Sequence, residues 1–171
     1  MYRRTYVALA ALLLFGGCAG VPTGFGLSFK EQYSVARAAL DEGRYKVAVK
    51  KYQALVVSDT GVRLNGRLSL ELAHALLRNG DYEAAASTAR RVAVSEGGAG
   101  RSLALAVQGT AEHEIARGMM DKGLYGPKAR AHLVSSIKAM DEMLKKHPKL
   151  DQGEAMKRRR VIAKRELATF R

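Results

Sequence analysis

The sequence predicts an all-α protein, a short α-solenoid of about seven antiparallel helices. Apolar residues recur with helical spacing in successive segments, and no segment of useful length alternates with a period of two. Of the 171 residues, 47% are hydrophobic and 26% are charged, so we expect a packed core. The chain has only three Pro and is dominated by Ala and Leu, which lose little rotamer freedom in a helix.

Residues 1–17 have the layout of a secretory signal peptide. Arg3 and Arg4 form a short cationic region, residues 7–15 are apolar, and two glycines follow. The apolar stretch is too short to cross a bilayer, which takes about 20 residues. We therefore expect residues 1–17 to be removed during export.

Cys18 is the single cysteine of the chain and directly follows Phe15-Gly16-Gly17. This segment resembles the bacterial lipobox, with Phe15 in place of the more usual Leu. The resemblance implies that lipid is attached to the Cys18 thiol and that the protein is sorted to the outer membrane, because Ala19 rather than Asp comes next. Acyl chains anchor a protein with about 0.8 kcal/mol per buried methylene. The alternative is an ordinary signal peptide that ends near a cysteine.

The net charge of +13 indicates an anionic partner or well-solvated basic helix faces. Removal of Arg3 and Arg4 with the signal peptide would leave +11, since 13 − 2 = 11. Acidic proteins and anionic lipid head groups are both possible partners. Export makes nucleic acid the least expected one, so we predict no nucleic-acid partner. With one cysteine there is no disulfide framework, and stability must come from packing.

The helical domain is expected over residues 28–171, after a lipidated Cys18 and a tether that extends to residue 27. The tether is rich in Gly and lacks helical spacing, which is typical of a flexible linker. Ser28 and Glu31 then form a capping-box pattern, which predicts that the first helix begins at Phe29.

Six further helices follow from the same spacing of apolar residues. Gly43 ends the first helix, Asn79-Gly80 the third and Gly97-Gly98 the fourth, while Pro127 is a favoured first-turn residue for the sixth. The expected helices after the first cover residues 45–56, 64–76, 82–93, 101–119, 127–144 and 151–170.

A pattern of glycine, tyrosine and alanine occurs twice, 37 residues apart. We expect the glycine to leave the first helix of a hairpin in a left-handed conformation, the tyrosine to open the second helix, and the alanine to permit close helix approach. The repeat-defining residues are Gly43, Tyr45 and Ala48 in one copy and Gly80, Tyr82 and Ala85 in the other.

This pattern resembles the tetratricopeptide repeat, whose period is about 34 residues. The repeats would cover about residues 29–62 and 66–99, with a degenerate third copy from about residue 101 in which Ala129 is one residue out of register. The departures from the family are the absence of Trp and of a Pro that closes the first repeat. The alternative is a chance pair of helical hairpins.

The order of features along the chain resembles the BamD-type outer-membrane assembly lipoproteins. A lipobox, two hairpins, residues 102–109, residues 143–148 and a basic helix over residues 151–170 follow one another in that order. The resemblance implies a lipid-anchored scaffold at the periplasmic face of the outer membrane, with β-barrel assembly components as partners. Pilus and secretion-system assembly lipoproteins share the anchor and the hairpins, so a pilotin-like factor that binds a secretin or pilin is the alternative.

No motif predicts an enzyme or a metal site. Glu112-His113-Glu114 differs from the zinc motif H-E-x-x-H because Arg117 stands where the second His would be, so we interpret it as a surface charge cluster. We expect no cofactor other than the covalent lipid on Cys18.

Two groups of residues are candidates for partner binding. The first helices of stacked hairpins line a concave surface, and the polar residues expected there are Gln32, Arg37, Arg67, Glu71 and His74. The second group is the densest run of charge, which consists of Lys157, Arg158, Arg159 and Arg160.

The last helix also carries a narrow apolar stripe of Met156, Ala163, Leu167 and Phe170. A basic amphipathic helix of this kind binds an acidic partner or anionic head groups. The other interpretation is a terminal helix that caps the solenoid and turns its charged side to water.

Overall fold

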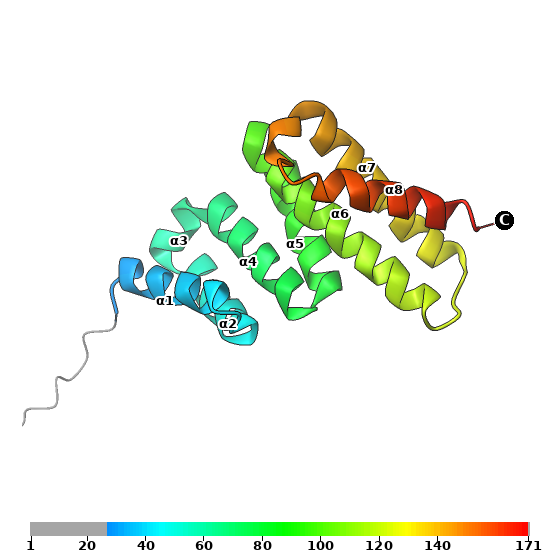
Figure 1. Ribbon diagram of the computed structural model, residues 1–171. Helices are drawn as coiled ribbons and strands as arrows, with labels where there is room; N and C mark the ends of the chain where they lie inside the picture. Colours follow the sequence, from blue (N-terminus) through cyan, green and yellow to red (C-terminus); the bar gives the residue numbers. More distant parts are fainter. Residues whose placement is uncertain (1–26, 171) are drawn as a thin grey trace, which may run out of the picture.

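The computed structural model describes residues 27–170, so the expected signal peptide, Cys18 and most of the expected tether lie outside the described residues (Figure 1). The described part is all helical and forms a solenoid-like stack, which confirms the predicted fold class. The elements are α1 (Phe29–Asp41), α2 (Tyr45–Val56), α3 (Asp59–Arg63), α4 (Asn65–Asn79), α5 (Tyr82–Ser95), α6 (Gly98–Met120), α7 (Pro127–Lys146), the 3₁₀ turn η1 (Pro148–Leu150) and α8 (Ala155–Leu167).

Consecutive long helices pack side by side, so the molecule is an elongated row with α1 at one end and α7 and α8 at the other (Figure 1). The neighbours in this row are α1 and α2, α2 and α4, α4 and α5, α5 and α6, α6 and α7, and α7 and α8. Helix α1 begins as expected, because the Ser28 hydroxyl accepts from the Glu31 amide at 3.3 Å and the Glu31 carboxylate accepts from the Ser28 amide at 2.7 Å. Hydrogen bonds that the Glu31 carboxylate accepts from the Ser28 hydroxyl and then from the Ser28 amide lower the pKa of Glu31.

The turn glycines of both repeats adopt the expected left-handed conformation, with φ of +76° at Gly43 and +85° at Gly80. In each turn the amide of the following residue donates to the carbonyl five residues earlier, at 2.8 Å after Gly43 and 3.0 Å after Gly80. The next helices begin at Tyr45 and Tyr82, and the two repeat alanines are fully buried.

In the third copy, Gly123 and Tyr125 hold the positions of the repeat glycine and tyrosine. This copy keeps the glycine turn, but its tyrosine does not open the next helix. Gly123 has φ of +73°, and the amide that follows it makes the same bond at 3.0 Å. Helix α7 nevertheless begins at Pro127, so Tyr125 stays outside the hairpin and is 61% exposed. It contacts Phe170 instead, with the ring centroids 5.8 Å apart. Ala129, which the sequence places out of register, is still buried.

The short helix α3 was not expected. Its first turn is capped by the Ser58 hydroxyl, which accepts from the amide of Gly61 at 3.1 Å. A side chain could not replace this glycine without movement of the backbone, because an added Cβ would lie 1.7 Å from the Leu55 carbonyl oxygen. Residues that the repeat pattern treats as a connection therefore form an additional helical turn between α2 and α4.

Helix α6 is longer than expected and is buried on more than one side. It packs against α5 and α7, and also against α4 and α8. Its residues belong to all three apolar clusters of the molecule: Ala111 and Ile115 to the cluster of α1–α5, Leu105 to the one it shares with α5 and α7, and Ala116 to the one it shares with α7 and α8. Every apolar cluster among residues 27–170 thus includes this helix.

Candidate partner-binding surface

Glu71 of α4 is the centre of a polar network that joins α4 to the first hairpin. Its carboxylate lies 3.2 Å from the Arg37 guanidinium and accepts from the hydroxyls of Tyr33 and Tyr52, each at 3.4 Å. Arg67 stacks on the Tyr33 ring at 5.7 Å from its centroid and donates to its hydroxyl at 3.3 Å. The structure thus brings together three of the residues expected on the concave surface.

The charges of this network shift the titration of its members. Burial raises the pKa of Tyr52, and the nearby Glu71 and Tyr33 raise it further. The pKa of Arg37 is raised by its hydrogen bond to Asp41 and then by the charge of Glu71. At neutral pH Tyr52 is therefore a neutral phenol and Arg37 a cation within this network.

His74 lies beside this network, whereas Gln32 does not. Desolvation lowers the pKa of His74 from its ordinary value of 6.5, and the positive charge of Arg78 lowers it further. Gln32 donates to the Leu27 carbonyl at 2.6 Å and so holds the chain where it enters α1. Gln32 was also expected on the concave surface, but its side chain has this local structural role and does not join the Glu71 network.

An open cavity of about 300 Å³ lies between the network and α6. Arg37, Glu71 and His74 line one wall, and the apolar side chains of Leu103 and Val107 line the other. Leu103 is 41% exposed although it is a large aliphatic residue on a helix with much buried surface. The cavity therefore combines an apolar wall with cationic, anionic and titratable groups.

A second open cavity of about 510 Å³ lies farther along α6, between α6 and α8. Thr110 and Arg117 line it from α6, and Met156, Arg158 and Ile162 line it from α8. Residues 103, 107, 110 and 117 follow helical spacing, so both cavities open on one side of α6. We name the two cavities together the inner surface.

The basic run of α8 divides into paired and unpaired residues. Arg159 lies 2.5 Å from the Glu114 carboxylate, Arg160 lies 2.8 Å from that of Asp141, and Lys157 pairs with the neighbouring Glu154 at 2.9 Å. Arg158 is exposed and has no ion-pair partner among residues 27–170. Half of the run thus holds α8 against α6 and α7.

The apolar stripe faces the solenoid, as the capping interpretation predicts, although α8 covers only Ala155–Leu167 of the helix expected over residues 151–170 and Phe170 lies beyond its end. Ala163 is fully buried, and Met156, Leu167 and Phe170 pack against the clusters of α6 and α7. This arrangement favours the interpretation that α8 caps the stack. The binding of a partner or of lipid by the basic run stays a prediction.

The interpretation of Glu112-His113-Glu114 as a surface cluster was wrong. Glu112 and His113 are only 1% and 2% exposed, because α6 is covered by neighbours on both of these sides. Glu112 binds the Arg90 guanidinium, lies 2.5 Å from His132 Nδ1, and accepts from the Ser135 hydroxyl at 3.2 Å. A buried carboxylate thus joins α5, α6 and α7.

His113 makes the corresponding link on the other side of α6. Its Nε2 lies 2.6 Å from the Glu166 carboxylate of α8, and its Nδ1 lies 3.2 Å from Arg159. Sequence reasoning missed both links, since the partners are at least 20 residues away and carry no shared motif. The feature that would have revealed them is the position of this charged triplet within a helix that has apolar residues on every side.

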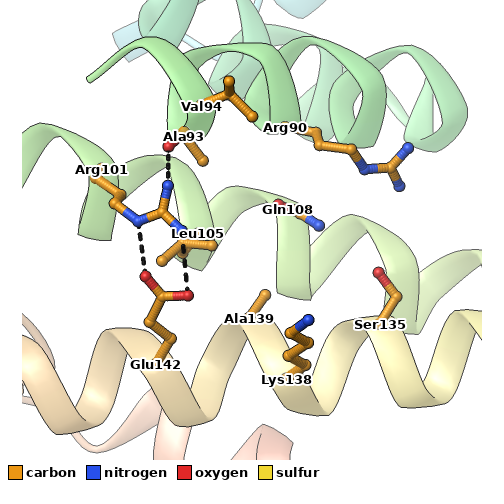
Figure 2. A pocket seen from close by; sticks show the side chains of 10 residues that line it. All are labelled: Arg90, Ala93, Val94, Arg101, Leu105, Gln108, Ser135, Lys138, Ala139 and Glu142. Carbon is orange, nitrogen blue, oxygen red and sulfur yellow. Dashed lines mark hydrogen bonds and ion pairs between the residues drawn. The ribbon is translucent and has the colours of Figure 1, made fainter. Parts of the chain in front are cut away.

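A cleft of about 230 Å³ lies on the side of α6 that faces α5 and α7. Figure 2 shows Arg101 between the carbonyl of Ala93 and the carboxylate of Glu142, to which it donates at 2.6 and 3.2 Å, with Arg90 and Lys138 along the same cleft. The hydrogen bond from Arg101 lowers the pKa of Glu142. This ion pair closes one end of the cleft by joining α6 to α7.

Ser102 Oγ lies 2.7 Å from His147 Nδ1, but Ser102 is only 2% exposed and so does not meet solvent. No group of three or more His, Cys, Asp or Glu side chains within residues 27–170 is placed to hold a metal ion. In the same range, no helix combines the length and the apolar character that a membrane span needs.

Comparison of the chain with models of protein families, with curated proteins and with solved structures found no match.

Proposed function

We propose that the protein is a lipid-anchored scaffold of the bacterial envelope that binds partner proteins on its inner surface. The lipobox-like segment at Cys18 supports the anchor, and the solenoid-like stack supports a binding role rather than a catalytic one. We further propose that the partners act in the assembly of outer-membrane proteins, following the resemblance in the order of sequence features. Tethering to the same membrane raises the local concentration of a partner, so individually weak contacts suffice.

The observation that carries this proposal is the inner surface itself. It presents exposed aliphatic side chains such as Leu103 and Ile162 beside Arg37, Glu71 and Arg158, and it extends along one side of α6. Protein interfaces combine an apolar centre with charged groups at the rim in this way. A segment of a partner with aliphatic anchors and carboxylates fits the two cavities.

Site-specific photocrosslinking tests the proposal. A photoreactive side chain at Leu103 should form adducts in intact cells, while the same group at Val134 should form few. The control is matched because Val134 is 43% exposed, against 41% for Leu103, and lies on α7 outside the lining of both cavities. Equal adduct patterns at the two positions would contradict a role of the inner surface.

The identity of the adducts separates the proposed machines. β-barrel assembly components support a role in outer-membrane protein assembly, whereas a secretin or pilin supports the pilotin-like alternative. Mass spectrometry of the purified native protein tests the anchor separately, since the mature chain should begin at Cys18 and carry lipid.

A further inference from the structure

The end of the solenoid where the chain enters α1 carries exposed aliphatic side chains that the fold does not need. These residues, which we name the entry patch, are Leu27 (52% exposed), Val57 (77%), Val62 (61%) and Leu64 (45%). They come from the start of the described chain, the end of α2, α3 and the residue before α4. The other exposed aliphatics of the described residues lie on different elements or loops, except for two that share α8: Val35, Val47, Val94, Leu103, Leu124, Val134, Leu150, Val161 and Ile162.

The residues of the entry patch lie at the same end of the molecule. A cavity of about 140 Å³ is lined by Phe29 of α1 together with Leu64 and Leu68, so the first turn of α1 lies beside the start of α4. Val57 and Val62 flank the Ser58 cap of α3, which joins α2 to α4. In Figure 1, α3 lies next to the blue end of α1 at which the chain enters.

The surface around the entry patch is cationic. Helix α2 presents the exposed Lys46, Lys50 and Lys51, and α3 adds the exposed Arg63 against one exposed carboxylate, that of Asp59. Within residues 27–170 none of these lysines has an ion-pair partner, although cations of α1, α5, α6 and α8 do. Lys50 lies seven residues before Val57, the C-cap residue of α2, and therefore on the same side of the helix, whereas Lys46 lies in the first turn.

We infer that the entry patch and the lysines of α2 rest on the anionic surface of the membrane to which the protein is tethered. This inference rests on the proposed function, because it takes Cys18 to be lipidated. Residues 19–26 separate Cys18 from Leu27, and even a fully extended chain of that length reaches at most roughly 30 Å. The entry patch is thus the part of the described protein that is held nearest to the acyl chains.

The chemistry of the surface fits head groups. Lysines beside an anionic leaflet are attracted electrostatically, and aliphatic side chains next to them can enter the boundary between head groups and acyl chains. The sequence also predicts head-group binding for the basic run of α8, but two of its four cations, Arg159 and Arg160, form ion pairs with Glu114 and Asp141. The lysines of α2 have no such internal partners in the described residues, so their charge is available to lipid.

Fluorescent probes on single cysteines test this orientation. Lipidation leaves no other free thiol, so Val57→Cys, Val62→Cys and the control Val94→Cys can each be labelled alone in the full, lipidated chain. Val94 is 80% exposed, similar to Val57, but lies on α5. In vesicles of phosphatidylethanolamine and phosphatidylglycerol, a quencher on the lipid head group should quench the probes at residues 57 and 62 several-fold more than the probe at residue 94.

Replacement of the three α2 lysines by Gln should largely abolish this difference in anionic vesicles. Each lysine near such a surface is expected to change the docked population by roughly fivefold. The matched control is Lys145→Gln with Lys146→Gln at the end of α7, which should leave the difference unchanged. Vesicles of phosphatidylcholine alone should also show a reduced difference, since they lack the anionic lipid.

Three results would overturn the inference. Equal quenching at residues 57, 62 and 94 in a chain that floats with the vesicles would show that the anchor holds but the entry patch does not dock. Shielding of the probes in detergent that grows with protein concentration would assign the patch to a second copy of the chain. A chain that does not float and takes up thiol label at Cys18 would remove the anchor, and with it both the inference and the lipid-anchored function.

Discussion

Gly109→Ala tests the packing between α6 and α7, because the added methyl group has two opposite effects on stability. It favours the helical backbone, but it also crowds the contact between the two helices. Alanine in place of glycine inside a helix ordinarily stabilises by about 1 kcal/mol. At Gly109, however, an added Cβ would lie 2.9 Å from Met140 Cγ and 3.2 Å from the Ser136 carbonyl oxygen. Met140 can move, but the carbonyl belongs to α7, and the Ser136 hydroxyl already donates to the Gly109 carbonyl at 2.7 Å.

Overpacking of a filled core costs about 1–3 kcal/mol, so Gly109→Ala should lower the free energy of unfolding or at best leave it unchanged. The matched control is Gly118→Ala on the same helix, where an added Cβ meets no atom within 4 Å. That variant should gain about 0.5–1 kcal/mol. The two variants should therefore differ by about 1–3 kcal/mol, and thermal midpoints move by roughly 2–4 °C per kcal/mol in a chain of this size.

Urea and thermal unfolding of the non-lipidated domain, followed by circular dichroism, would measure the difference. If Gly109→Ala were as stable as Gly118→Ala, α6 and α7 would not approach each other as closely as described, and the reasoning would fail. An additional Met140→Ala change should relieve part of the clash in Gly109→Ala and so regain part of the lost stability. The same change should itself cost about 2–5 kcal/mol, since Met140 is fully buried. A double-mutant cycle then isolates the contact.

Three further predictions concern the turn, the inner surface and the buried carboxylate. Gly80→Ala should destabilise by about 1–2 kcal/mol because φ is +85°, whereas Gly97→Ala should be nearly neutral, and urea unfolding of the two variants would compare them. The lowered pKa of His74 means that the unfolded chain binds this proton more readily, so stability declines as pH falls below 6.5. His74→Gln should flatten that decline between about pH 7.5 and about pH 5.5, and an unchanged pH profile would disprove the role of this group. Glu112→Gln should destabilise the protein by about 1–3 kcal/mol, and Glu114→Gln, at a more exposed site, by less. If calorimetry found equal losses of stability, the Glu112 carboxylate would not be the buried link between α5, α6 and α7.

The parts of the fold that local chemistry decides could be predicted from the sequence. The capping box at Ser28 and Glu31 and the left-handed turns at Gly43 and Gly80 depend on residues within one turn of each other, and each adopts the expected geometry. The apolar spacing placed the long helices because one face of each must be buried. Helix α3 could not be predicted in this way, because its five residues are too few to show a helical spacing of apolar side chains.

The partners of charged residues could not be predicted, because they depend on the register between helices. Glu112 lies between Arg90 and His132, which come from the preceding and the following helix. The sequence shows a charged triplet, but it does not show that neighbours cover α6 on both sides at that point. For the same reason, the pairing of Arg160 with Asp141, which removes one cation from the expected basic surface, only emerges from the packing of α8.

The participation of α6 in all three apolar clusters has a consequence for how the chain can be divided. Repeat arrays are usually shortened or extended one module at a time, because each module contacts only its neighbours. Here a deletion of α7 and α8 would expose Leu105 and Ala116 to solvent. A deletion of α1–α5 would expose Ala111 and Ile115. Truncated fragments should therefore aggregate, and the whole stack should melt as one cooperative unit.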